Sequence, residues 1–204
     1  MPATMKSRKP KRSPTTPDRI LDVAQRLMQK RGYNGFSYAD VAGEIGISKA
    51  SLHHHFSTKA ALGAAIIERY AGQTRDALAG IAADKPAAPE RLAAFAQLYA
   101  DVLAKDRLCL GAMLAAEFGT LPQPMQKTVR QFFNDNHGWL EQVIAAGRTA
   151  RTLSPQGSDG DAARVVLGGL EGAMLIARPL KDIDSFHLTA RALLAGLQPR
   201  SRAM

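Results

Sequence analysis

The sequence predicts an all-α protein of about nine helices, with an N-terminal three-helix domain that contains a helix-turn-helix and a larger helical C-terminal domain. Apolar residues recur at the three- and four-residue spacing of amphipathic helices, and no segment alternates with the period of two expected of a strand. Capping residues before these stretches, and Gly or Pro after them, divide the chain into separate helices.

Composition is that of a cytoplasmic globular protein. Apolar residues make up 46% of the 204 residues and charged residues 22%, which are ordinary values. The most apolar region, residues 162–180, is interrupted by Arg164, Glu171 and Arg178, so we expect no membrane span. The N-terminus has no apolar run after its basic residues, so we expect no signal peptide. The single Cys109 excludes an internal disulfide and fits a reducing compartment.

Positive charge is concentrated at the N-terminal end. The formal net charge is +9, and residues 1–63 hold 11 Lys or Arg against 4 Asp or Glu, a net of +7. The remaining 16 basic and 14 acidic residues, in 64–204, give a net of +2. This distribution is expected of a module that binds a polyanion.

Residues 1–16 are predicted to form a disordered basic arm. They contain five Lys or Arg, three Pro, no acidic residue and almost nothing to bury. Two roles are open: an arm that reaches phosphates or a minor groove, or a solubilising tail. The first helix then has Thr16 as its cap and Pro17 in its first turn, and Gly32 ends it.

A helix-turn-helix is the clearest motif in the sequence. Ser37 and Asp40 have the spacing of a capping box, and Gly46 supplies the left-handed residue that ends a short helix. Ser48 then caps a second short helix over residues 49–55. Two helices joined by a tight Gly-containing turn are the pattern of this motif, with an ordinary helical hairpin as the alternative.

The exposed side of the second helix is predicted to read DNA, because its residues are polar or small and can enter a major groove. The candidates for base or groove contacts are Lys49, Ala50, Ser51, His53 and His54. The candidates for phosphate contacts are Ser37, Tyr38 and Lys59.

The segment ILDVAQRLMQKRGYNGFSYADVAGEIGISKASLHHHFSTKAAL resembles the DNA-binding domain of the TetR family of transcriptional repressors. The resemblance covers residues 17–62 and implies a dimer, a second all-helical ligand-binding domain, and release of operator DNA when a ligand binds. We therefore expect a DNA-binding domain over residues 17–63 and a ligand-binding and dimerisation domain over 64–204. One departure is His53, where the family usually has Tyr, which puts the contact expected of that Tyr in doubt.

Six further helices are expected after the motif. A long helix capped by Ser57 or Thr58 should run without a break to about residue 83 and link the two domains rigidly. The others are predicted at about residues 89–105, 108–121, 124–151, 161–177 and 185–197, with Pro or Gly marking the loops.

Large apolar side chains from several of these helices are candidates for lining a ligand cavity. Such a set is usually core, and the resemblance favours a cavity bounded by aromatic and flexible side chains. The candidates are Phe95, Tyr99, Met113, Phe118, Phe132, Phe133, Trp139 and Met174. Glu117, the only carboxylate in the run GAMLAAEFG, would bind a cationic or hydroxylated effector, with a salt-bridged helix residue as the alternative.

Cys109 is a candidate for the same cavity and for a second kind of regulation. A thiol near the start of a helix is expected to have a lowered pKa because of the helix N–H groups, which would let it sense electrophiles. Burial beside Leu108 and Leu110 would instead raise the pKa, as expected of a small core residue.

Four small residues in one helix predict the dimer interface. Each Gly inside a helix destabilises it by roughly 1 kcal/mol relative to Ala, so a close partner helix is expected to compensate. Gly168, Gly169, Gly172 and Ala173 would contact the same helix of a second subunit, and residues 185–197 would complete a four-helix bundle. Close packing within one subunit is the alternative.

These features predict a ligand-responsive transcriptional regulator that binds a palindromic double-stranded DNA operator as a homodimer and is released by a small-molecule effector. An electrophile or redox sensor acting through Cys109, and an architectural DNA-binding protein with a filled core, are the alternatives. The sequence has no catalytic arrangement, phosphate-cradling loop or cofactor motif, so we expect no enzyme. Its three adjacent His side chains point about 100° apart on a helix, so we expect no metal site.

Overall fold

The computed structural model describes residues 15–199, and within this range it contains nine α-helices, one short 3-10 helix and no strand. The elements are α1 (Thr16–Arg31), α2 (Tyr38–Ile45), α3 (Lys49–His55), α4 (Lys59–Asp84), α5 (Ala88–Leu103), α6 (Leu110–Ala116), η1 (Phe118–Thr120), α7 (Gln123–Thr149), α8 (Asp159–Leu180) and α9 (Ile183–Ala195). The predicted all-α fold is confirmed. The predicted basic arm lies outside the described residues except for its last two positions.

Local signals set the ends of the first helices. Thr15 caps α1 through a capping box, one residue before the predicted Thr16. Ser37 forms the predicted capping box with Asp40 at the start of α2. Gly46 ends α2 at φ 73 and ψ 36, a left-handed conformation that Gly adopts without strain. The helix-turn-helix therefore forms from its own short-range hydrogen bonds and one glycine.

Two clusters of buried apolar side chains hold the helices together. One joins α1, α2 and α3 to the first half of α4, and it receives Leu110 and Leu114 from α6 and Met125 and Val129 from α7. The other fills the space between α4, α5, α7, α8 and α9. Because α4 and α7 contribute to both clusters, the helix-turn-helix end is packed directly on the C-terminal helices.

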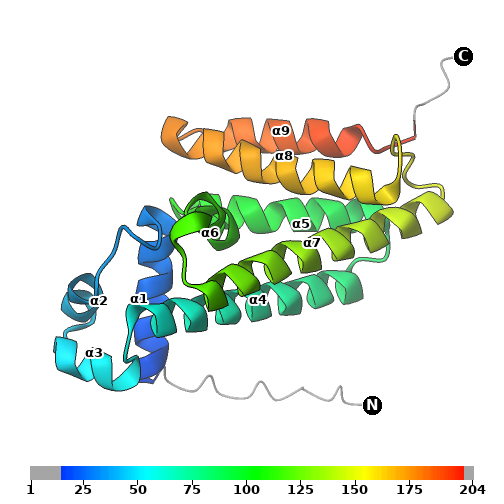
Figure 1. Ribbon diagram of the computed structural model, residues 1–204. Helices are drawn as coiled ribbons and strands as arrows, with labels where there is room; N and C mark the ends of the chain where they lie inside the picture. The colour runs from blue at the N-terminus through cyan, green and yellow to red at the C-terminus, as the bar shows by residue number, and fades with distance from the viewer. Residues whose placement is uncertain (1–14, 200–204) are drawn as a thin grey trace, which may run out of the picture.

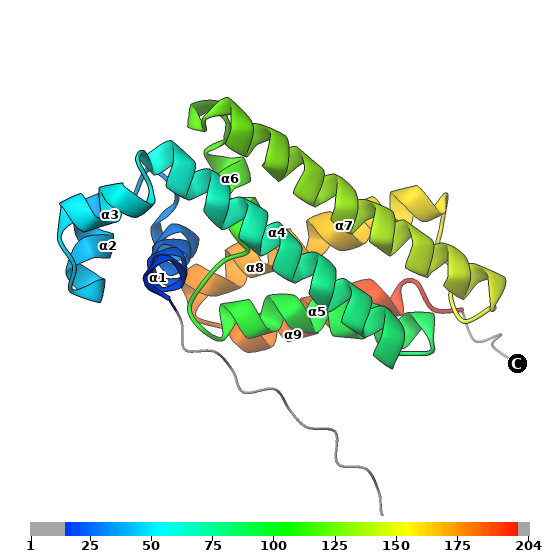
Figure 2. The same ribbon diagram turned by 90° about the horizontal axis from the view of Figure 1, so that it is seen from below.

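The helices are arranged in layers that extend from the helix-turn-helix end. Figure 1 shows α1 to α3 at one end of the molecule, with α8 and α9 side by side as an outer layer. The view from below in Figure 2 shows α4 and α7 running next to each other, with α8 and α9 behind them. One face of α8 and α9 is therefore left on the outside of this subunit. No helix within residues 15–199 combines the length and apolar character needed to cross a membrane.

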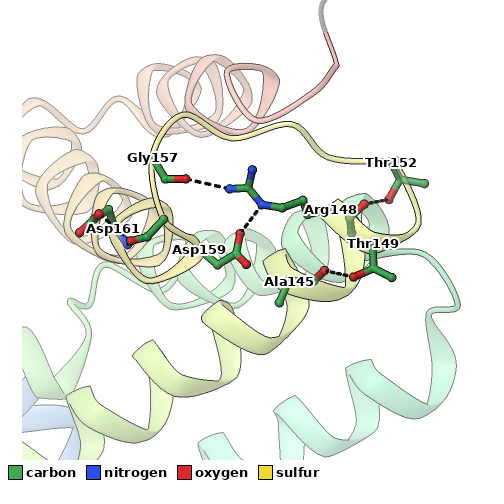
Figure 3. A network of polar contacts seen from close by, with 9 residues as sticks. Ala145, Arg148, Thr149, Thr152, Gly157, Asp159 and Asp161 are labelled. Carbon is green, nitrogen blue, oxygen red and sulfur yellow. Dashed lines mark hydrogen bonds and ion pairs between the residues drawn. The ribbon is translucent and has the colours of Figure 1, made fainter.

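A polar network closes the loop between α7 and α8 (Figure 3). Arg148 donates from Nε to Asp159 Oδ1 at 2.8 Å and from Nη2 to the Gly157 carbonyl oxygen at 2.9 Å. The Thr152 hydroxyl donates to the Gly147 carbonyl oxygen at the end of α7. The network lies at the end of the bundle opposite the helix-turn-helix. Its ion pair between Arg148 and Asp159 joins the end of α7 to the start of α8.

The helices after α4 differ from their predicted extents, and α6 and α8 show the largest differences. α8 begins two residues earlier than predicted and continues through Pro179, which lies in its last turn, before Lys181 ends it at φ 52. A proline there removes one hydrogen bond near a helix end, where the ladder is already incomplete. α6 stops at Ala116 instead of residue 121, because the chain turns into η1 at Glu117.

Candidate DNA-binding surface and ligand pocket

α3 presents a polar face to solvent. Lys49, Ala50, His53 and His54 are exposed and Ser51 is half-buried. Leu52, on the opposite side of α3, is fully buried in the core that α1 and α2 share. The burial of this one leucine orients α3, so the five predicted DNA-reading residues lie on the outward side of the helix or at its edge.

His53 and His54 differ in the contacts that their rings make within the protein. The His53 ring packs on Tyr38 with ring centroids 4.6 Å apart, and its Nδ1 lies 3.2 Å from the Ser57 carbonyl oxygen. The His54 ring contacts His55 at 5.5 Å. His54 is therefore the more available of the two for a base edge.

Two of the predicted phosphate contacts, Ser37 and Tyr38, use their hydroxyl protons inside the protein. Ser37 Oγ donates to Asp40 Oδ2 at 2.6 Å as part of the capping box. Tyr38 Oη donates to the Phe56 carbonyl oxygen at 2.7 Å, which ties the start of α2 to the end of α3. Phosphate binding by these hydroxyls stays a prediction, and it requires the two hydrogen bonds to be exchanged for bonds to DNA.

Lys59, the third predicted phosphate contact, folds back over two aromatic rings. Its Nζ lies 4.8 Å from the centroid of Tyr33 and 4.7 Å from that of Phe36, distances typical of cation–π contacts. Burial lowers the pKa of Lys59, although Glu117 and Asp40 raise it. Lys59 therefore fixes the start of α4 against the loop that follows α1, and phosphate binding by it stays a prediction.

A pocket of ≈ 220 Å³ lies between α4, α5, α7 and α8. Five of the predicted lining residues reach it: Phe95, Tyr99, Cys109, Phe132 and Met174. The sequence interpretation missed the lining residues of α4 and part of those of α5 and α7, namely Tyr70, Gln73, Thr74, Ala77, Leu98, Asp101, Val102 and Asn136. No sequence signal separates these positions from ordinary core or surface positions of an amphipathic helix.

The other five predicted ligand residues do not line this pocket: Met113, Glu117, Phe118, Phe133 and Trp139. Trp139 stacks on Phe95 with centroids 5.6 Å apart, so it supports a lining residue from behind. Phe118 packs under the Arg130 guanidinium at 4.7 Å, and Phe133 bridges the two apolar clusters. A role for these five residues in effector binding stays a prediction, although none of them lines this pocket.

Glu117 joins the two parts of the molecule. Its Oε2 accepts from the Tyr33 N–H at 2.5 Å and its Oε1 from the Asn34 N–H at 3.2 Å. A Cβ at Gly32 would lie 2.7 Å from the Glu117 carboxylate, so the glycine makes room for this contact. Within the described part of the chain Glu117 makes no ion pair, so the salt-bridged alternative is not seen, and an effector contact stays a prediction.

A buried carboxyl group behind the pocket was missed. Glu171 is the only acidic residue between residues 162 and 180, a signal interpreted above only as evidence against a membrane span. Its Oε1 accepts from Tyr99 Oη at 3.3 Å, and its Oε2 is buried without a hydrogen-bond partner in residues 15–199. Burial raises the pKa of Glu171 to about 7, and hydrogen bonds from Cys109 and Tyr99 oppose this rise. A proton or a ligand donor near Oε2 would therefore be stabilised.

Cys109 is a buried thiol that is not activated. It lies at the N-cap of α6, but burial raises its pKa well above the usual value and the Glu171 charge raises it further. Tyr70 Oη also lies 3.7 Å from the sulfur. Of the two directions considered for the pKa, the rise expected of a core residue applies, because loss of solvent outweighs the N–H groups of a seven-residue helix. The thiol remains protonated near neutral pH, which removes the main argument for an electrophile sensor.

The outer face of α8 and α9 is apolar. The large hydrophobic side chains that are exposed within residues 15–199 all lie on these two helices: Val165, Leu175, Ile176, Leu180 and Leu188. A Cβ at Gly168 or Gly172 would meet nothing within 4 Å, so both glycines open onto this face. A Cβ at Gly169 would lie 2.8 Å from Leu193 of α9, and Ala173 is buried in the same subunit. Of the four predicted interface residues, Gly168 and Gly172 therefore face outward, whereas Gly169 and Ala173 pack inside the subunit.

Comparison with known proteins identifies the class to which this arrangement belongs. Residues 20–66 match the model of bacterial regulatory proteins of the tetR family, and residues 88–193 match the tetracyclin repressor-like C-terminal domain. The chain belongs to the TetR family. Members of this family are transcriptional regulators rather than enzymes, and the helix-turn-helix described above is their DNA-binding element.

Two similar proteins align with most of the chain, and a third aligns with a short segment of it. The crystal structure of a TetR-family regulator from Agrobacterium tumefaciens is 30% identical with a TM-score of 0.86, over 90% of this chain and 97% of that one. An HTH-type regulator in the lacX 3′ region of Lactococcus lactis subsp. lactis is 24% identical over 173 residues, 83% of this chain and 86% of its own. IcaR, the negative regulator of the biofilm operon icaADBC in Staphylococcus aureus (strain Newman), is 43% identical over 42 residues, or 21% of this chain and 23% of IcaR.

Proposed function

We propose that this TetR-family regulator is a homodimeric repressor that binds a palindromic operator and is released by a small, largely apolar effector. The observation that carries the proposal is the course of α4. Its first half contributes Leu62, Ile66 and Ile67 to the core under the helix-turn-helix. Its middle contributes Tyr70, Gln73, Thr74 and Ala77 to the pocket. A ligand in the pocket would therefore contact α4, the helix that packs against α1 to α3.

The effector acts by favouring one of two positions of α4. In the DNA-binding state, the two α3 helices of a dimer would sit one DNA turn apart, ~34–36 Å. A ligand that fits the pocket better when α4 is displaced shifts the population toward a state with another spacing. The mostly apolar lining of the pocket favours an apolar effector.

Dimerisation through α8 and α9 is supported by the exposed apolar face on these helices. Apolar side chains such as Ile176 and Leu188 are more than half exposed in the single subunit. A second copy would remove this area from water, and a two-fold axis would place identical faces against each other. Repression, as opposed to activation, is supported by the match of 42 residues to the negative regulator IcaR.

Selection of bound duplexes from a random DNA library tests the operator half of the proposal. The purified protein should enrich an inverted repeat whose half-sites lie about 10 base pairs apart, or a multiple of this spacing. Enrichment of a single asymmetric site would argue against the dimer. Binding without sequence preference would favour the architectural protein.

Filling the pocket tests the effector half. Ala77→Leu should keep operator affinity but lose release by compounds that release the wild-type protein from DNA, because the added side chain occupies the ligand volume. Ala79→Leu is the matched control, since Ala79 lies on the same helix and is exposed to solvent. Equal release of both variants would place the effector elsewhere.

A further inference from the structure

A second pocket lies where α1 meets α4, next to the apolar pocket, with which it shares Gln73. Its walls come from α1, α4 and the segment between α5 and α6, around a volume of ≈ 320 Å³. We call it the arginine pocket, and its lining residues are Asp22, Val23, Gln25, Arg26, Arg69, Gln73 and Arg107.

Two of the three arginines are partly occupied by neighbours. Arg69 donates from Nη1 to Asp22 Oδ1 at 2.8 Å and from Nη2 to Gln25 Oε1 at 2.9 Å. Arg26 pairs with Glu44 of α2. These bonds hold the two guanidinium groups in place and use the only carboxylate that lines the pocket, that of Asp22.

Arg107 is the uncompensated charge of the pocket. No carboxylate within residues 15–199 pairs with it, and residues 1–14 and 200–204 contain no Asp or Glu. Its Nε, like that of Arg69, is buried without a hydrogen-bond partner in the described chain. Burial and the nearby Arg26 charge lower the pKa of Arg107. A buried donor on a charged group is destabilising until an acceptor meets it.

The surroundings of the pocket do not supply the missing negative charge. Lys30 and Arg178, next along the seam between α1 and the C-terminal helices, share the single carboxylate of Asp106. Arg178 also donates to the Lys30 carbonyl oxygen at 3.0 Å. Basic groups therefore outnumber acidic groups along this seam.

We propose that the arginine pocket binds a phosphate group, held by Arg107 and by the free Nε of Arg69. A guanidinium presents parallel N–H donors that match two phosphate oxygens, and a dianion offsets more positive charge than a carboxylate does. The phosphate would bridge α1, α4 and the segment before α6, so it would fasten the helix-turn-helix end to the pocket-bearing helices. This site shares only Gln73 with the apolar pocket, and the proposal does not depend on the function proposed above.

Thermal unfolding of the DNA-free full-length protein tests the site. Inorganic phosphate and glycerol 3-phosphate are each compared with chloride at equal ionic strength and pH, which distinguishes a free ion from an organic phosphate. At several times the Kd, binding should raise the Tm by about 2–4 °C. Arg107→Gln should remove the rise, and Arg151→Gln, at an exposed arginine at the far end of α7, should keep it.

A second variant separates loss of the site from loss of the fold. Gln73→Glu places a carboxylate in the pocket beside the unpaired arginine. It should raise the Tm without phosphate and should also abolish the phosphate response, whereas Arg107→Gln abolishes only the response. The proposal is overturned if neither phosphate compound raises the wild-type Tm above the chloride control, or if Arg107→Gln retains the full response.

Discussion

His54 is the α3 residue best placed to determine sequence preference, because His53 is already held by Tyr38 and Ser57. His54→Ala should therefore change the preferred base at one position of each half-site, with a loss of ~1–3 kcal/mol on the original operator. His53→Ala should weaken binding more evenly across sequences, since it removes packing on Tyr38. Fluorescence anisotropy on an operator and its single-base variants gives both values. An unchanged base preference in His54→Ala would mean that another element reads the sequence.

Glu171 makes the stability of the fold depend on pH. Its pKa in the folded protein is about 7, above the ordinary 4.5, so the folded state keeps a proton that the unfolded chain releases. The stabilisation by the protonated form is complete below pH 4.5, decreases as the pH rises through 7, and is absent above. The difference approaches ~3 kcal/mol if the whole shift is realised.

Urea unfolding between pH 5 and pH 8 measures this dependence. Glu171→Gln should flatten the part of the curve that belongs to Glu171, because the amide does not titrate. Glu68→Gln, at an exposed position of α4, should leave the curve unchanged and serves as the control. Identical pH profiles for the wild type and Glu171→Gln would show that the carboxyl group titrates normally.

At the scale of the helices, the outer face of α8 and α9 carries the expected subunit contact. Ile176 is 65% exposed, so Ile176→Lys does not disturb the fold of one subunit. It would place a charge in an apolar interface, and the protein should sediment as a monomer with lower operator affinity. Ala79→Lys, on the exposed side of α4, should remain dimeric. A tight dimer in Ile176→Lys would move the interface to another surface.

The helices also show which features of the structure are readable from sequence. Ser37, Gly46 and Ser48 act as predicted, because caps and turns depend on contacts within three or four residues. α6 was predicted too long because Glu117 leaves the helix to bond the Tyr33 and Asn34 N–H groups, more than 80 positions away in sequence. Such long-range contacts leave no periodic signal.

The same difference between short-range and long-range contacts decides which candidate site residues could be predicted from the sequence. The outward face of α3 was predicted because one buried leucine orients a short helix. Five of the ten predicted ligand residues line the pocket, since an aromatic residue such as Phe95 can line a cavity or, like Trp139, pack behind a lining residue. Which of the two applies depends on how the helices cross. Glu171 was missed because a lone acid in an apolar helix is equally consistent with a solvated position.

At the scale of the whole molecule, several contacts join the helix-turn-helix end to the helices that line the pocket. One is α4, whose side chains belong to both apolar clusters. Another is Glu117, just after α6, which bonds the loop that follows α1. A third is Lys30 of α1, which pairs with Asp106 and accepts from Arg178 through its carbonyl oxygen. We expect these contacts together to make α1 to α3 follow a change at the pocket.

Glu117→Ala should therefore weaken the coupling more than it weakens DNA binding. Two backbone N–H groups lose a charged acceptor, one of them on the buried Tyr33, and the free energy of unfolding should fall by about 1–3 kcal/mol. The helix-turn-helix itself is intact, so operator affinity without effector should change little. The concentration of effector needed for release should rise, because one of these connections is gone. Glu117→Gln, which keeps one acceptor oxygen, should lie between the wild type and Glu117→Ala in both measurements. If Glu117→Ala were destabilised as expected but released from the operator at the wild-type effector concentration, the Glu117 contact would have no part in the coupling.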